Sequence, residues 1–220
     1  LGGAWVLVPQ CPTMWMDDGK GSPLMTNNES IYVEQVKTLV DSFLAEHGAE
    51  IDRDQIFIAG NSNGGFMTVK QAIAYPDFYA AAVPVCEAVM ADLVTEEELS
   101  AMKDVPTWFV HSRYDFVVAP EKSVLPLYRR LKEANAREVH LTFLGNITDE
   151  SGLFRYPDGT PYTYIPHFAW VPMYNNACRT DADGSPVVKD GFQVGIFEWL
   201  RRTRLSQRKG GKSNAEGNSV

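Results

Sequence analysis

The sequence predicts an α/β fold in which a mostly parallel sheet is flanked by helices. Short apolar runs, each about as long as a buried strand, alternate along the chain with longer stretches of helical periodicity. One of these runs also leads through a glycine-rich turn directly into a helical stretch. Strands that alternate with helices form βαβ units, and βαβ units build parallel sheets.

Five short apolar runs are expected to be buried strands, because each is bounded by proline, glycine or polar residues. They lie at residues 4–9, 55–59, 80–85, 107–111 and 139–144. Pro84 lacks a backbone N–H, so the third run is expected to end early or to fray there.

Six stretches are expected to be helical from the spacing of their apolar residues. They lie at residues 28–47, 66–75, 90–104, 120–134, 167–176 and 190–203. Gly48 and Pro76 are suitable stops for the first two, and Pro120 suits the first turn of the fourth. A long loop is expected at about residues 145–166.

The composition indicates one globular domain. The chain has 220 residues, of which 45% are hydrophobic and 22% charged, values that are ordinary for a globular protein and unlike those of a disordered one. We assign residues 1–205 to this domain. Residues 206–220 are mostly Gly, Ser, Asn and Lys, so they are expected to form a disordered polar tail.

Charge and cysteine content exclude several classes of function. The formal net charge of −8 opposes binding to nucleic acid or to an anionic membrane, and no apolar run approaches the ~20 residues that span a bilayer. The cysteines are Cys11, Cys86 and Cys178. Because they form no C-x-x-C pair and their number is odd, neither a disulfide framework nor a zinc site is expected. The chain starts at Leu1 and shows no signal peptide, so its localisation stays open.

The strongest motif is Gly60-Asn61-Ser62-Asn63-Gly64, which fits G-x-S-x-G between a predicted strand and a predicted helix. A nucleophilic serine needs such a sharp turn, because the turn lifts its hydroxyl above the edge of the sheet. The backbone N–H of Asn63 would then lie at a helix N-terminus, where it can donate to an oxyanion. A glycine-rich turn without chemistry is the alternative. The lysine of a phosphate-binding loop is missing.

An activated serine requires a base, and the chain has only four histidines. The order that accompanies a G-x-S-x-G turn is serine, acid, histidine. His47 precedes Ser62, while His111 and His140 lie in predicted strands. His167 follows the last predicted strand, in a loop just before a helix, and is therefore the predicted base. A surface histidine that caps the following helix is the alternative.

Asp115 is the predicted acid, because it lies in the loop that follows the strand at 107–111. An aspartate that merely opens a turn is the alternative interpretation. Asp149 and Glu150 are rival acids after a later strand, and Glu87 suits a pocket residue better by its place in the order.

With these residues placed, the sequence resembles the α/β-hydrolase superfamily, and within it the esterase branch. That branch includes poly(3-hydroxybutyrate) depolymerase-like and phospholipase/carboxylesterase-like proteins and shades into the prolyl oligopeptidase family. The segments that carry the resemblance are WVLVPQCP (5–12), IDRDQIFIAGNSNGGFMT (51–68), YPDFYAAAVPVC (75–86), VPTWFVHSRYDFVV (105–118) and HFAWVPMYNN (167–176).

The sequence departs from the family pattern in two places. Asn63 is polar where a hydrophobic residue is more common, although its backbone N–H is retained. The resemblance also makes residues 4–9 the fourth strand, so the N-terminal strands and one oxyanion donor have no residues here. In the family, the third strand lies between the fourth and the fifth, so the strands at 4–9 and 55–59 would be about 9–10 Å apart without it. Each would then have unpaired backbone groups in the centre of the sheet, which is costly. We therefore expect the chain to be a fragment of the fold.

The resemblance implies hydrolysis of carboxylic esters through an acyl-enzyme. Ser62 would be the nucleophile, His167 its base, Asp115 the residue that orients the imidazole, and Asn63 an oxyanion donor. No cofactor or metal is implied, and the substrate would be a small-molecule or polymer-derived ester. Residues that would line its pocket are Trp15, Glu87 and Trp170.

Two other functions remain open at this stage. A prolyl oligopeptidase-type peptidase would share the same three residues, although the sequence contains no propeller repeat. A catalytically idle binding module on the same fold is the alternative outside enzymes. The acyl group, the alcohol and the oligomeric state are not determined by the sequence.

Overall fold

The computed structural model describes residues 3–209 and contains one four-stranded parallel sheet in the order β1-β2-β3-β4. Its strands are β1 (Phe57–Asn61), β2 (Ala81–Val85), β3 (Thr107–Ser112) and β4 (Val139–Leu144). The α-helices are α1 (Val33–His47), α2 (Asn63–Ala74), α3 (Glu96–Met102), α4 (Val124–Glu133), α5 (Trp170–Tyr174), α6 (Ile196–Arg202) and α7 (Ser206–Lys209). Short 3₁₀ turns occur at η1 (Arg53–Gln55) and η2 (Ala91–Leu93).

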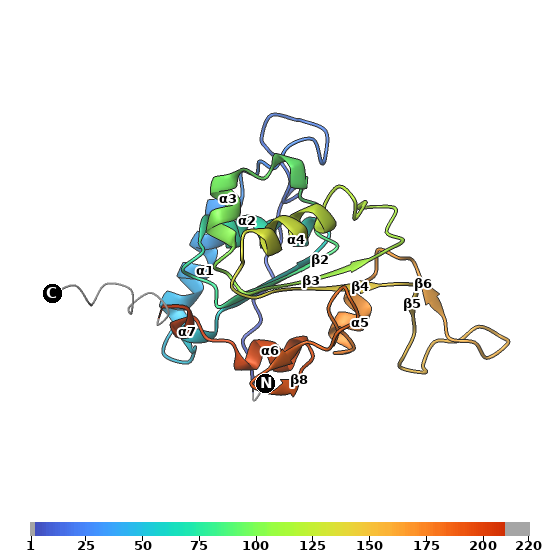
Figure 1. Ribbon diagram of the computed structural model, residues 1–220. Helices are drawn as coiled ribbons and strands as arrows, with labels where there is room; N and C mark the ends of the chain where they lie inside the picture. The colour runs from blue at the N-terminus through green and yellow to red at the C-terminus, as the bar shows by residue number, and fades with distance from the viewer. Residues whose placement is uncertain (1–2, 210–220) are drawn as a thin grey trace.

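Helices cover both faces of the sheet, with α2, α3 and α4 on one face and α5 and α6 on the other (Figure 1). Alternate residues of β3 serve the two layers, as the two-residue period of a strand requires. Phe109 packs in a buried cluster with residues of α2, α3 and α4. Trp108 and Val110 pack in a second cluster with residues of α5 and α6. The two central strands, β2 and β3, are therefore buried on both sides, which accounts for their nearly continuous apolar runs.

Four of the five predicted strands are present, within about two residues of their expected ends. β2 does not end at Pro84. Pro84 pairs with Gly60 of β1, and the chain beyond it still bonds to β3 through the Cys86 N–H and the Val110 carbonyl, at 2.9 Å. The missing proline N–H therefore leaves the strand intact, because the bonds on either side of it hold.

The predicted strand at residues 4–9 is wrong. These residues form no strand, and 53% of Trp5, 78% of Val6 and 71% of Val8 is exposed. A strand needs a hydrogen-bonded neighbour, and β1 ends the sheet order without a further strand beside it among residues 3–209. The ring of Trp5 instead stacks on His47 at the end of α1, with centroids 5.0 Å apart.

The prediction of a disordered tail is wrong for residues 206–209, because these residues form the helix α7. The Ser206 N–H and hydroxyl each donate to the Asp54 carboxylate at 2.6 Å. The Arg208 guanidinium donates to the carbonyls of Tyr79 and Pro76 at 2.7 and 2.6 Å. These hydrogen bonds hold residues 206–209 in place, although the segment has no apolar side chain. Residues 210–220 lie outside the described part of the chain.

Residues 3–209 also contain two small β-hairpins that the sequence analysis did not predict. The expected loop at 145–166 contains the antiparallel pair β5 (Ile147–Thr148) and β6 (Thr163–Tyr164), which extends beyond the sheet in Figure 1. A second pair, β7 (Val188–Lys189) and β8 (Phe192–Gln193), precedes α6. Four helices also begin four to six residues later than predicted: α1 at Val33, α3 at Glu96, α4 and α6. α4 begins at Val124, after a turn in which the Leu125 N–H bonds to the Pro120 carbonyl, and α6 begins only at Ile196.

The helices of residues 3–209 include none that is both long and apolar enough to cross a membrane.

Candidate active site

Ser62 occupies a sharp turn between β1 and α2. It follows the last residue of β1 and is the N-cap of α2. Its φ of 57° and ψ of −116° form a backbone conformation that is unfavourable for a residue with a side chain. The Ser62 N–H donates to the Val85 carbonyl at 2.8 Å, which holds the turn against the end of β2. A serine with an exposed hydroxyl is the residue for which such a strained turn is useful.

The glycines of the motif allow two backbones to approach closely. A Cβ on Gly60 would lie 2.3 Å from the Gly64 carbonyl oxygen, and one on Gly65 would lie 2.6 Å from the Val85 carbonyl oxygen. Both distances are shorter than van der Waals contact allows, so neither position accepts a larger residue without movement of the turn. A Cβ on Gly64 would meet no atom within 4 Å. The structure thus shows why the position two residues before the serine requires glycine.

Asp115 and His167 form a direct pair, as their order along the chain predicted. His167 Nδ1 lies 2.7 Å from Asp115 Oδ2, and both residues are buried. Asp115 is in the loop after β3, and His167 lies three residues before α5. Asp115 Oδ1 accepts the backbone N–H groups of Val117 and Val118, at 2.9 and 3.0 Å. The loop thus folds around its own carboxylate, which fixes the direction of Oδ2.

The hydrogen bonds of Asp115 keep it ionised. Burial alone raises the pKa of this carboxyl group, but hydrogen bonds from His111, His167 and the Val118 N–H outweigh burial and hold the pKa far below its usual range. A carboxylate therefore faces His167 Nδ1 at neutral pH. Since a carboxylate only accepts, Nδ1 must carry the proton, and Nε2 is left as the acceptor when the imidazole is neutral.

Ser62 and His167 both contact the chain at the end of β2. Ser62 bonds to Val85, and the thiol of the next residue, Cys86, lies 3.5 Å from the His167 carbonyl oxygen. No hydrogen bond joins the Ser62 hydroxyl to the His167 ring within residues 3–209. Such contacts are often long before a substrate binds. Asn63 begins α2, and its side-chain oxygen accepts the Met16 N–H at 3.2 Å.

Two further residues, for which the sequence predicted no role, also lie close to Asp115. One is His111, whose ring nitrogen is 3.3 Å from Asp115 Oδ2. The other is Cys86, which has a φ of +42° and whose thiol lies with the Asp115 and His167 ligand atoms within 4.8 Å of one another. This trio is compact enough for a metal ion. However, burial raises the pKa of the Cys86 thiol, which disfavours the thiolate that a metal prefers.

The three predicted pocket residues lie in different environments. Trp15 is partly buried against Tyr32, with ring centroids 5.7 Å apart, next to the Met16–Asn63 bond. Trp170 is partly buried at the start of α5. Glu87 has no exposed surface, one carboxylate oxygen accepts the Val89 N–H at 2.7 Å, and the other has no partner among residues 3–209. Burial raises the pKa of Glu87 to about 8, which favours its uncharged form at neutral pH. Its side chain does not reach solvent.

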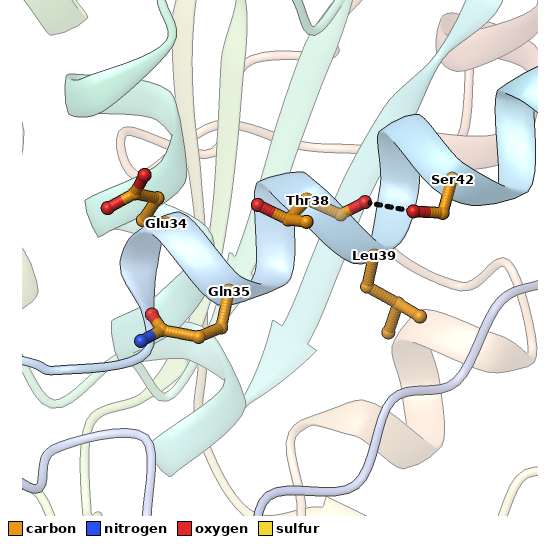
Figure 2. Close-up of a pocket in the computed structure, with 5 residues that line it drawn as sticks. All are labelled: Glu34, Gln35, Thr38, Leu39 and Ser42. Carbon is orange, nitrogen blue, oxygen red and sulfur yellow. Dashed lines mark hydrogen bonds between the residues drawn. The ribbon is translucent and has the colours of Figure 1, made fainter.

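A shallow hollow of about 410 Å³ runs along the outer face of α1 (Figure 2). Its lining comes from one helix: Glu34, Gln35, Thr38, Leu39 and Ser42. The Ser42 hydroxyl donates to the Thr38 carbonyl at 2.9 Å, and none of Ser62, Asp115 and His167 is part of the lining. The hollow is therefore not the site of the candidate chemistry.

The parallel sheet, the strand–serine–helix turn and the Asp–His pair together define an α/β-hydrolase fold. The chain belongs to the phospholipase/carboxylesterase family, whose model matches residues 6–146. That match includes Ser62 and Asp115, while His167 lies beyond it.

Individual relatives share smaller regions. Poly(3-hydroxyalkanoate) depolymerase C of Paucimonas lemoignei is 40% identical over 50 residues, which are 23% of this chain and 12% of that protein. The crystal structure of a thermostable esterase matches 77% of this chain and 37% of its own, with 24% identity and a TM-score of 0.52, which shows the shared fold. An acylaminoacyl peptidase of Pyrococcus horikoshii matches 81% of this chain and 31% of its own, with 17% identity and a TM-score of 0.48. The chain spans well under two thirds of the length of these proteins.

Proposed function

We propose that this chain is the catalytic part of a serine hydrolase that cleaves carboxylic esters through an acyl-enzyme on Ser62. The single observation that carries the proposal is the buried Asp115–His167 pair, in which Nδ1 and Oδ2 lie 2.7 Å apart. Within residues 3–209 no hydrogen bond occupies Nε2 of His167, and His167 contacts the end of β2, to which Ser62 also bonds. Membership of the phospholipase/carboxylesterase family supports esters as the substrate class.

Each residue has a defined part in the proposed reaction. Ser62 Oγ attacks the ester carbonyl carbon while His167 Nε2 takes the hydroxyl proton, and Asp115 stabilises the imidazolium that forms. The Asn63 N–H, at the start of α2, donates to the carbonyl oxygen as it becomes negative. His167 then returns the proton to the departing alkoxide, which leaves as the alcohol.

The second half of the reaction repeats these roles with water. His167 Nε2 removes a proton from a water molecule as its oxygen attacks the acyl-enzyme carbonyl. The bond to Ser62 Oγ breaks, and the serine recovers its proton from His167. The carboxylic acid leaves and the enzyme is restored. The strained backbone of Ser62 supports this cycle because it keeps the nucleophile in one orientation.

The surroundings of the site suit an ester with an apolar part. Tyr114 and Phe116 flank Asp115 and are 59% and 74% exposed, and Ile165, two residues before His167, is 46% exposed. The depolymerase named above is a relative by local similarity, so hydroxyalkanoate esters belong in the test. We propose a small-molecule or polymer-derived ester as the substrate.

The test is a comparison of hydrolysis rates on an aryl acetate, a hydroxyalkanoate oligoester and an aminoacyl-proline anilide. We expect ester hydrolysis by the wild type and loss of roughly 10⁴-fold or more in Ser62→Ala. Ser42→Ala, on the outer face of α1, is the matched control and should retain the rate. Near-normal turnover in Ser62→Ala would overturn the proposal. Preference for the anilide would favour a peptidase, and failure to hydrolyse any of the three would favour a binding module.

A further inference from the structure

A second histidine, besides His167, contacts the candidate acid. His111 lies in β3, four residues before Asp115, and has no exposed surface. Its Nε2 atom is 3.0 Å from the Val118 carbonyl oxygen and 3.3 Å from Asp115 Oδ2. Asp115 Oδ2 therefore lies close to two imidazole nitrogens, one from the sheet and one from the loop before α5.

The neighbours of His111 determine its tautomer. A backbone carbonyl oxygen and an ionised carboxylate both accept hydrogen bonds, so Nε2 must carry the proton that it shares between them. Nδ1 of His111 is buried and has no hydrogen-bond partner within residues 3–209. A buried nitrogen without a partner is costly. The Nε2–H contact to the acid loop is thus the polar interaction that explains a histidine at this position.

The contacts of the Asp115 carboxylate leave it one orientation. Oδ1 accepts the two backbone N–H groups of Val117 and Val118, while Oδ2 bonds to His167 and also lies 3.3 Å from Nε2 of His111. Three of these four donors belong to the acid loop and to His167, which lie outside regular secondary structure. His111 is the donor on a central strand of the sheet, which is the most rigid element near the site.

The charge of Asp115 is shared between the two imidazoles. The other titratable group at the carboxylate is the thiol of Cys86, which follows β2, and burial keeps it uncharged by raising its pKa. A hydrogen bond from His111 therefore withdraws part of the negative charge that Asp115 presents to His167. Loss of that bond would leave more of the charge to stabilise the His167 imidazolium.

We propose that His111 is a positioning residue of the active site, which aligns the Asp115 carboxylate with His167 through its Nε2–H and sets the charge that His167 experiences. The proposal rests on the proposed function for the role of His167. Nothing in it requires His111 to touch the substrate, so its removal affects kcat and leaves KM unchanged.

Two variants of His111 test the proposal. His111→Leu fills the space without a donor, and His111→Gln retains an N–H near the position of Nε2. We expect His111→Leu to lower kcat by about ten- to a hundred-fold, the effect expected from one hydrogen bond to a charged group. The acid limb of its kcat/KM profile should move to higher pH. His111→Gln should recover most of kcat and bring the acid limb back. Equal loss in both variants, or an acid limb that does not move, would show that His111 only fills space and would overturn the proposal.

A measurement on the unmodified chain decides the matter if His111→Leu does not fold. In ¹⁵N NMR spectra of the histidine rings, we expect His111 as the Nε2–H tautomer, with a chemical shift that changes at the midpoint at which His167 titrates. The Nδ1–H tautomer, or a His111 shift that ignores the His167 titration, would contradict the proposal. Absence of Ser62-dependent turnover would overturn the proposed function alone, because the NMR result does not depend on turnover.

Discussion

Two of the histidine–aspartate pairs within residues 3–209 place Nδ1 of the ring within 3.0 Å of the carboxylate, and they differ in what faces the second ring nitrogen. His167 Nδ1 is 2.7 Å from Asp115, and His140 Nδ1 is 3.0 Å from Asp181. The other nitrogen of His140 is buried and faces a second carboxylate, Glu138, at 3.6 Å. No such carboxylate faces Nε2 of His167 among the described residues. A histidine enclosed by two acids has no free nitrogen for a nucleophile.

The surroundings of His140 are those of a structural clamp. Asp181 also accepts the Tyr128 hydroxyl at 2.8 Å and the Leu141 N–H at 2.9 Å, which join α4 and β4 to the loop before β7. Glu138 accepts the Trp199 indole N–H and the Lys189 ammonium, which join β4 to α6 and β7. A histidine–aspartate distance alone therefore does not identify a base. What distinguishes the two pairs is that His167 contacts the end of β2, to which Ser62, the proposed nucleophile, also bonds.

The largest expected difference between the pairs concerns turnover. Asp115→Asn should lower kcat by roughly 10⁴-fold, because an amide no longer fixes the tautomer and charge that His167 needs. Asp181→Asn should leave kcat within a few-fold but lower the midpoint of urea unfolding. The reason is that an amide has one acceptor oxygen where the carboxylate of Asp181 has two, so some of the donors that bond to it lose their partner. Steady-state kinetics and urea titrations of both variants check this prediction. Comparable kcat losses in the two variants would remove the distinction.

A smaller expected effect is the pH dependence of stability at the clamp. Burial lowers the pKa of His140, but Asp181 and Glu138 outweigh burial and raise it above the usual 6.5. A raised pKa means that the folded state binds the proton more tightly. The stabilisation is thus fully present below about pH 6.5 and is lost as the pH rises through the folded-state pKa.

His140→Gln isolates this contribution. The stability difference between the wild type and this variant should be larger at about pH 5.5 than at about pH 8.5, measured from urea unfolding at both values. Lys189 and Tyr128 remain in both proteins, so their own titrations cancel in the difference. A difference that is constant or grows with pH would show that His140 is not held in its charged form.

The sequence could predict the centre of the molecule better than its edges. β2 and β3 are buried on both faces, so their apolar runs are sufficient to identify them. Residues 4–9 carry the same kind of pattern, but a strand also requires a neighbour, and the apolar pattern does not show whether one exists. The order of Ser62, Asp115 and His167 could be inferred because each follows or precedes a predicted element.

The contacts of His111 and Cys86 could not be predicted in the same way. His111 lies in the apolar segment of a predicted strand, where a histidine is expected to be an ordinary buried residue. The available signal was its spacing, four residues before the predicted acid, at the end of the same strand. Cys86 lies close to the acid and has a positive φ, a conformation that the identity of a cysteine does not predict. Both contacts are products of the tertiary fold.

The most direct test of the central claim is covalent labelling with a fluorophosphonate, with the modified residue mapped by mass spectrometry. The account predicts a label on Ser62 in the wild type, a label at a similar rate in His140→Gln, and labelling slowed by several orders of magnitude in His167→Ala. A label on another residue, or labelling that survives in His167→Ala and is lost in His140→Gln, would contradict the assignment of His167 as the base that acts on Ser62.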